Sequence, residues 1–114
     1  MAENRPNLQK GLQNEILKFF LLMHLSRGEG YPYALLKAIK FKRIWILNGL
    51  TKNDLYNTIK SLENKGLIKG KPVRKGAMTQ KHYVLTPKGR VVARASKGMM
   101  LKAFKSVAET LRRV

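Results

Sequence analysis

The sequence predicts a single, mainly α-helical domain with a small β-hairpin. Three observations predict this fold class. Apolar residues recur at helical spacing near both ends of the chain, and residues 51–65 carry the start and stop signals of a complete helix. Two extended stretches around a glycine-containing loop follow that helix directly. The 114 residues suffice for one modest core, so we expect residues 1–114 to form one domain, with its core over 8–86 and a final helix over 87–114.

The first predicted helix covers residues 8–26. From Phe19 to Leu25 it is apolar nearly all round, which predicts that other elements cover it on several sides. His24 lies in this part and is interpreted as a packed core residue rather than a ligand. Two residues at the less densely apolar end are expected to meet a partner chain: Leu8 and Leu12.

The second predicted helix covers residues 31–40, because Pro32 is tolerated at a first helical position and glycines precede it. Residues 41–50 are predicted to form a short strand or an irregular hydrophobic link. Trp45 in this stretch is interpreted as buried packing. Trp45 and the cleft between two subunits are also where we would look for a small-molecule effector, which the sequence does not identify.

The third predicted helix is delimited at both ends. Thr51 is a good N-cap, Asp54 completes a capping box, and Gly66 supplies the left-handed residue that stops the helix. One narrow apolar stripe faces inward: Leu55, Ile59 and Leu62. The opposite face is polar and basic, and it carries the first set of candidate DNA-binding residues: Lys52, Asn53, Tyr56, Asn57 and Lys60.

The predicted hairpin consists of residues 67–74 and 81–86, with a loop at 75–80 that is longer than the tight two-residue turns. Four of its basic residues are expected to contact phosphates: Lys71, Arg74, Lys75 and Lys81.

The last predicted helix begins with Thr86 as cap and Pro87 at the first position, and runs to about residue 113. Its apolar residues recur at close to heptad spacing over a length that a small core cannot cover. We therefore expect it to form a homodimer interface together with Leu8 and Leu12, through Met100, Phe104, Val107 and Leu111. The alternative, that this helix packs only on the first helix of its own chain, stays open.

The charge balance points to an anionic partner. Lys and Arg number 24 against 6 Asp and Glu, a formal net charge of +18. Nucleic acid is the first candidate, and a membrane surface is the weakest because the basic residues are not gathered on one amphipathic segment. The chain has no cysteine and no apolar run long enough to span a bilayer, so we expect a cytoplasmic, nucleoid-associated protein.

Catalysis finds no support in the sequence. The acidic residues are isolated, the two histidines have no cysteine or clustered carboxylate near them, and no phosphate-binding loop occurs. We therefore expect no enzyme activity, no cofactor and no metal.

The order of elements is that of a winged helix-turn-helix, in which the third helix enters the major groove and the hairpin reaches the backbone beside it. Asparagine can bond adenine, and lysine can bond guanine or phosphate. The leading hypothesis is a homodimeric, sequence-specific regulator of transcription on double-stranded DNA, with half-sites about one helical turn apart. Two alternatives stay open: a chromatin-type protein that binds DNA by charge alone, and a winged-helix module for RNA or protein assembly.

Three motifs stand in order along the chain: Gly30-Tyr31; Leu55-Tyr56, Ile59, Leu62-Glu63 and Gly66-Leu67-Ile68; and His82-Tyr83-Val84-Leu85-Thr86-Pro87-Lys88-Gly89-Arg90. Together they resemble the signature of the PadR-like transcriptional regulators. The resemblance implies a homodimeric, repressor-type protein with Tyr56 on the DNA face and, as in the smaller subgroup, one C-terminal helix for dimerisation. Asn57 stands where that family usually has Pro, and residues 40–49 are unfamiliar, which leaves a neighbouring family such as the MarR-like regulators open.

Overall fold

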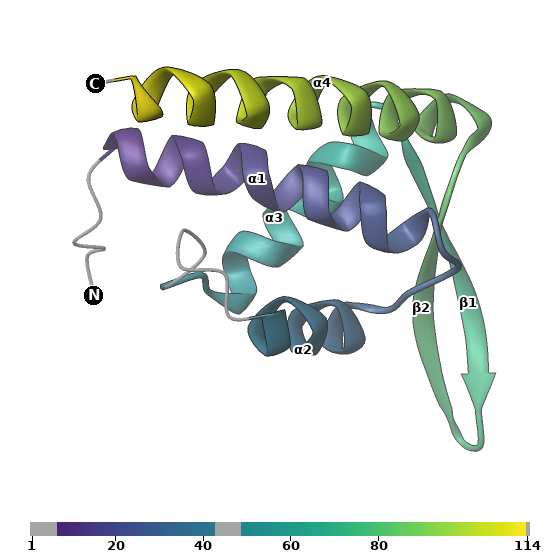
Figure 1. The fold of residues 1–114 in the computed structure, drawn as a ribbon. Helices are drawn as coiled ribbons and strands as arrows, with labels where there is room; N and C mark the ends of the chain where they lie inside the picture. Colours follow the sequence, from purple (N-terminus) through teal and green to yellow (C-terminus); the bar gives the residue numbers. More distant parts are fainter. Residues whose placement is uncertain (1–6, 43–48, 114) are drawn as a thin grey trace.

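The computed structural model describes residues 7–42 and 49–113, which form four helices and one hairpin (Figure 1). The elements are, in order, α1 (Asn7–Leu25), α2 (Pro32–Lys42), α3 (Lys52–Asn64), β1 (Ile68–Lys75), β2 (Met78–Leu85) and α4 (Pro87–Arg112). Helices α1 and α4 lie side by side, α3 crosses α1, and the hairpin projects away from the helices. This is the winged helix-turn-helix arrangement, and the predicted fold class is confirmed.

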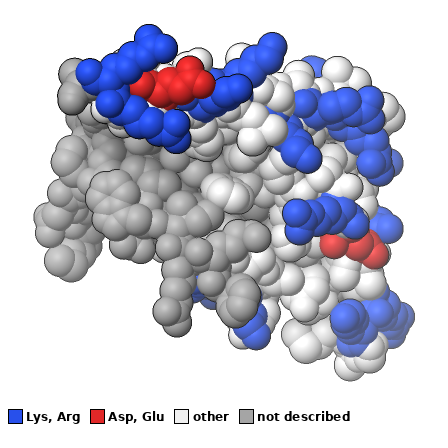
Figure 2. Space-filling view, in the orientation of Figure 1, with Lys and Arg blue, Asp and Glu red and all other residues white. Residues whose placement is uncertain are grey.

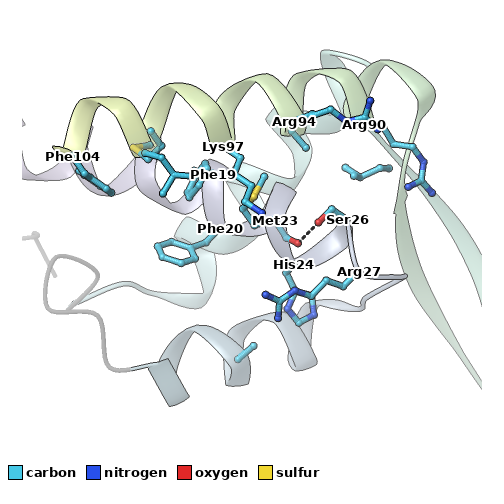
Figure 3. Close-up of a pocket in the computed structure, with 15 residues that line it drawn as sticks. Phe19, Phe20, Met23, His24, Ser26, Arg27, Arg90, Arg94, Lys97 and Phe104 are labelled. Carbon is cyan, nitrogen blue, oxygen red and sulfur yellow. Dashed lines mark hydrogen bonds between the residues drawn. The ribbon is translucent and has the colours of Figure 1, made fainter. Parts of the chain in front are cut away.

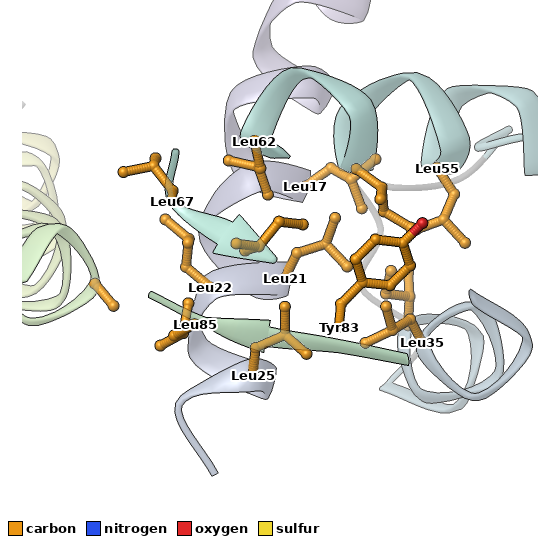
Figure 4. Packing of buried hydrophobic residues seen from close by; sticks show 14 of the residues in the cluster. Leu17, Leu21, Leu22, Leu25, Leu35, Leu55, Leu62, Leu67, Tyr83 and Leu85 are labelled. Atoms are coloured by element: carbon orange, nitrogen blue, oxygen red, sulfur yellow. The ribbon is translucent and has the colours of Figure 1, made fainter. Parts of the chain in front are cut away.

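The core forms where α1, α2 and α3 meet the base of the hairpin (Figure 4). Helix α1 contributes most to it, because α2, α3, α4 and β2 all pack against this helix. Its buried residues follow helical spacing, as do those of α3. The largest fully buried apolar side chains are Leu17, Leu21, Leu35, Leu55 and Leu62.

The second half of α1 is less covered than its composition predicts. Leu21, Leu22 and Leu25 are buried, whereas Phe19 and Phe20 are only partly buried. Met23 and His24 are likewise partly buried, so His24 is not the fully packed core residue that we expected. The side of α1 that carries these four residues borders a groove, described below.

The hairpin differs from its prediction in length and turn. Lys75 pairs with Met78, which leaves Gly76 and Ala77 as a two-residue loop in place of the longer loop predicted over 75–80. Gly76 has φ +61°, and tight hairpin turns need a positive φ at their first loop residue. The prediction was wrong because Gly-Ala lacks the Asn-Gly or Asp-Gly pair that usually marks such a turn.

The remaining elements lie close to their predicted bounds. Helix α2 extends two residues beyond its prediction, to Lys42, and α4 begins at Pro87 as predicted. Most of the predicted strand or link over residues 41–50, including Trp45, lies outside the described residues.

Thr86 joins α3, the hairpin and α4. Its hydroxyl donates a hydrogen bond to the carbonyl oxygen of Gly66 (2.6 Å) and accepts one from the N–H of Gly89 (3.0 Å). Its own N–H donates to the carbonyl oxygen of Leu67 (3.1 Å). Lys88 Nζ adds a bond to the carbonyl oxygen of Lys65 (3.1 Å). The end of α3 is therefore bonded directly to the start of α4.

Substitution by alanine should have opposite effects on stability at two glycines of α4. A methyl group at Gly89 would overlap the backbone carbonyl of Leu67, whereas none of the described atoms lies near a methyl group at Gly98. Gly89→Ala should lower the free energy of unfolding by about 1–3 kcal/mol through overpacking. Gly98→Ala should raise it by about 0.4–1 kcal/mol through a lower chain entropy in the unfolded state. Urea unfolding followed by circular dichroism measures both, and equal effects would contradict the packing described here.

Candidate nucleic-acid interface

Both ends of α3 are fixed by the local signals that the sequence predicts. The N–H of Asp54 donates to Thr51 Oγ1 (3.1 Å), and the N–H of Thr51 donates to Asp54 Oδ2 (2.9 Å), which completes the capping box. At the other end, Gly66 has φ +74°, and the N–H groups of Gly66 and Leu67 donate to the carbonyl oxygens of Glu63 and Leu62. The helix is thus held at a defined length and direction.

The two sides of α3 differ sharply in exposure. Leu55, Ile59 and Leu62 are buried, and so is Thr58, whose hydroxyl donates to the carbonyl oxygen of Asp54 (2.9 Å). All five residues predicted for the DNA-binding face are exposed: Lys52, Asn53, Tyr56, Asn57 and Lys60. The polar face of α3 is therefore open to a partner along its N-terminal two turns.

The four basic residues predicted for the hairpin are also exposed, but their surroundings differ. Lys71 Nζ lies 3.3 Å from Glu29 Oε2, and Lys81 Nζ lies 3.5 Å from Glu63 Oε2. Arg74 and Lys75, next to the turn, form no ion pair with the described residues. Among the described residues, Lys69 near the base of the hairpin also forms no ion pair, so two of the three unpaired cations lie near the tip.

Positive side chains extend well beyond the hairpin. On the face shown in Figure 2, Lys and Arg side chains lie along α4 and along the hairpin, with few acidic side chains among them. The sequence explains this, since no acidic residue occurs between Glu63 and Glu109.

The base of the hairpin is attached to the turn between α1 and α2, a contact that the sequence reasoning missed. Gly30 and Tyr83 form an antiparallel bridge with N–H to carbonyl distances of 3.0 and 2.7 Å. Beside it, the buried ring of His82 stacks on Tyr31 with 5.0 Å between centroids. His82 Nδ1 lies 3.4 Å from Glu29 Oε2, but without hydrogen-bond geometry. These contacts fix the root of the hairpin relative to α1 and α2.

Glu29 is the acidic residue at the root of the hairpin, beside both Lys71 and His82. The hydrogen bond from the Lys71 ammonium is the largest cause that holds the pKa of Glu29 below its ordinary value of 4.5, and the positive charge of Lys71 and contact with His82 act in the same direction. Burial raises the pKa of Tyr83, and the carboxylate of Glu63 adds to that rise, so its hydroxyl stays neutral at physiological pH. No periodic pattern signals these contacts, because the partners come from separate elements.

The Glu29–Lys71 pair predicts a pH-dependent contribution to stability. A depressed pKa means that the charged form is favoured in the folded state, so the contribution is present above the unfolded pKa and is lost as pH falls below 4.5. In a double-mutant cycle of Glu29→Gln and Lys71→Gln, the coupling free energy should be favourable at about pH 7 and should decrease as the pH is lowered to about 3. Thermal unfolding of the four proteins measures it. A coupling that is unchanged at the lower pH would contradict the pairing.

Over residues 7–42 and 49–113, no helix is long and apolar enough to cross a bilayer. The same ranges contain no group of three or more His, Asp or Glu residues placed to hold a metal ion.

Several solved structures share this fold. A PadR family transcription regulator from Clostridium difficile R20291 is 22% identical over 83% of this chain and 97% of its own, with a TM-score of 0.74. The PadR family regulator from Eggerthella lenta DSM 2243 is 27% identical over 89% of this chain and 86% of its own, with a TM-score of 0.73. Bacillus subtilis PadR, solved in complex with operator DNA, is 23% identical over 78% of this chain and 57% of its own, with a TM-score of 0.64.

The family comparison agrees with the structural one. No curated protein matches the chain. The model of the transcriptional regulator PadR-like family matches residues 21–95, which is more than half of the chain. Members of that family are transcriptional regulators and not enzymes, in agreement with the sequence-based expectation. The chain belongs to the PadR-like family of transcriptional regulators.

Proposed function

We propose that this protein is a homodimeric, sequence-specific regulator of transcription that binds double-stranded DNA with α3 in the major groove and the hairpin on the adjacent backbone. One observation carries the proposal: α3 buries its apolar side and exposes amide and ammonium groups next to a basic hairpin. The operator complex of Bacillus subtilis PadR supports it, because that relative shares the fold. Such a protein would act in the cytoplasm, at the nucleoid.

The exposed groups of α3 suit base edges. Asn53 and Asn57 each carry an amide that can accept and donate to adenine in a bidentate manner. Lys52 and Lys60 can donate to guanine or to phosphate. Because the capping box and the glycine stop hold α3 rigidly, these groups would meet DNA without first ordering the helix.

The tip of the hairpin suits the phosphate backbone. Arg74 and Lys75 have no acidic partner among the described residues, so their charges are available to phosphates. Lys71 and Lys81 would have to share their charge with Glu29 and Glu63. We therefore assign the main backbone contacts of the hairpin to its tip.

The exposed apolar side chains of α4 support a homodimer. Phe104 is 60% exposed, Val107 56% and Leu111 67%, and Leu12 on α1 is 49% exposed. Contiguous exposed apolar side chains of this kind mark interaction surfaces. Met100 is half-buried beside them, and the side chain of Leu8 lies outside the described part of the chain. A two-fold dimer through this surface would present two α3 helices to successive turns of DNA.

The two parts of the DNA-binding surface should respond differently to substitution. Asn57→Ala with Lys60→Ala should remove the preference among duplexes selected from a random pool, because base contacts specify. Arg74→Gln with Lys75→Gln should weaken binding to every duplex and reduce the slope of log K against log salt by about 2, since each phosphate contact contributes about 0.9. Fluorescence anisotropy over a salt series measures both.

Lys102→Gln with Lys105→Gln is the matched control, because it removes the same charge from α4 and should preserve selectivity. Selectivity that persists in the Asn57 and Lys60 variant would show that α3 does not read bases.

The net charge of +18 also suits a chromatin-type protein, and equal binding of the unaltered protein to all duplexes would favour that function. Preference for structured RNA would favour an assembly role.

The dimer has its own test. Phe104→Glu with Val107→Glu should yield a monomer in sedimentation velocity, because charged groups would enter an apolar interface. Helical circular dichroism should be retained, since both side chains are exposed in the single chain. Ser106→Glu, exposed on the other side of α4, should leave the dimer intact. A dimer that survives the first variant would exclude this surface.

A further inference from the structure

We infer that the outer face of α4 binds a second segment of double-stranded DNA, so that the protein connects two duplexes. Four cations define this outer face: Arg94, Lys102, Lys105 and Arg112. The inference rests on the proposed function for the first duplex, which α3 and the hairpin would hold. It adds a second DNA-binding surface that needs no sequence preference of its own.

Helix α4 carries more Lys and Arg residues than any other described element. Its sequence contains Glu109 as the single acidic residue and seven cations: Lys88, Arg90, Arg94, Lys97, Lys102, Lys105 and Arg112. All seven are exposed, and within residues 7–42 and 49–113 none of them forms an ion pair. Figure 2 shows positive side chains along the upper edge of the molecule, over α4. So much positive charge without acidic partners points to a polyanion.

A duplex bound to α3 and the hairpin would not cover the outer face of α4. In Figure 1, α4 lies above α1, whereas the first turns of α3 and the tip of the hairpin lie below it. The buried Ala93 marks the inner side of α4, and Lys102 follows it by two and a half helical turns, so Lys102 points away from the core. The outer face is therefore open while the first duplex is held.

The cations of the outer face share one side of the helix. Arg94, Lys105 and Arg112 follow the spacing i, i+11, i+18, which returns to nearly the same direction, and Lys102 is one turn before Lys105. At 1.5 Å per residue, the four cations extend over about 27 Å. Double-stranded DNA offers one negative charge per about 1.7 Å of its axis, so a duplex lying along α4 would present phosphates to all four cations.

The outer face is also separate from the proposed dimer surface. Lys105 and Val107 are two residues apart, so their side chains point about 200° apart around the helix axis. A homodimer formed through Phe104, Val107 and Leu111 would leave Lys105 in solvent. It would also bring two outer faces into one particle.

The groove between α1 and α4 is a different surface of the molecule (Figure 3). Its volume is about 670 Å³, and large apolar side chains form most of its lining: Phe19, Phe20, Met23, Met100, Leu101 and Phe104. The groove shares Met100 and Phe104 with the proposed dimer surface and therefore adjoins it. Of the four outer-face cations, Arg94 alone is part of the lining, and Lys102 and Lys105 lie outside it.

A second duplex fits the outer face better than a membrane surface does. A helix that lies on a membrane turns a broad apolar side toward the lipid. The broad apolar side of α4 faces α1 and the proposed dimer surface, and only separate apolar side chains, such as Val91 and Leu101, are exposed near the outer cations. Once α3 and the hairpin hold one segment of a long DNA molecule, its other segments are also present at high effective concentration.

Capture of a labelled duplex by an immobilised one tests the inference. The protein is bound to a duplex on beads, the excess is washed away, and the fluorescent duplex retained per bound protein is measured. The unaltered protein should retain the second duplex. Lys102→Gln with Lys105→Gln should retain at least about tenfold less of it, the usual effect of losing charge-assisted contacts. The affinity of this variant for a single duplex, measured by fluorescence anisotropy, should stay that of the unaltered protein.

Two control variants separate charge from position. Lys102→Arg with Lys105→Arg keeps both charges and should retain the second duplex as the unaltered protein does. Arg74→Gln with Lys75→Gln removes the same charge from the hairpin and should weaken binding to a single duplex instead. Sedimentation velocity measures the dimer in every variant, because the two α3 helices of a dimer offer another route to connecting duplexes.

Four results would overturn the inference. The unaltered protein could retain no second duplex. The Lys102 and Lys105 glutamine variant could retain it fully, which would assign the connection to the two α3 helices of a dimer. That variant could lose capture and the dimer together, or phosphatidylserine vesicles could displace the second duplex from the unaltered protein, which would assign the face to dimerisation or to a membrane surface. A failure of the proposed function appears instead in the selectivity and single-duplex affinity of the α3 and hairpin variants.

Discussion

The hydroxyl of Thr86 is the contact on which the working arrangement of this molecule depends. It bonds at once to the residue that stops α3 and to the first turn of α4. The N–H of the same residue bonds to Leu67, where the hairpin begins. The helix proposed to read bases and the helix proposed to dimerise are therefore connected by a joint of three hydrogen bonds. Because of these three hydrogen bonds, a change in the position of α4 would also change the position of α3.

Local signals explain how much of the fold could be predicted. Thr51 with Asp54, Gly66, and Thr86 with Pro87 act within one helical turn, and the helices begin and end where these residues require. The narrow stripe of α3 likewise predicts which of its side chains are exposed. The turn at Gly76 was misjudged because glycine there tightens the loop without the usual companion residue.

The parts that could not be predicted are contacts between distant elements. Glu29 meets Lys71 and His82 across more than forty positions of sequence, and no periodic pattern relates them. For this reason the sequence analysis gave the same role to the four hairpin cations that it predicted to contact phosphates, whereas Lys71 and Lys81 have acidic neighbours. The groove was missed for a related reason. An apolar run such as Phe19 to Leu25 predicts burial, but it does not reveal that α4 covers only part of it.

The hairpin has two strands, so each strand leaves an outer edge of backbone groups. Within residues 7–42 and 49–113, the one bridge to such an edge joins Tyr83 of β2 to Gly30. Open edges of this kind are templates for strand addition and aggregation. Pro72 removes a donor from β1, and Lys69, Lys71, Arg74 and Lys75 place repulsive charge along the same strand. The cations of the hairpin thus also disfavour strand addition between copies of the protein.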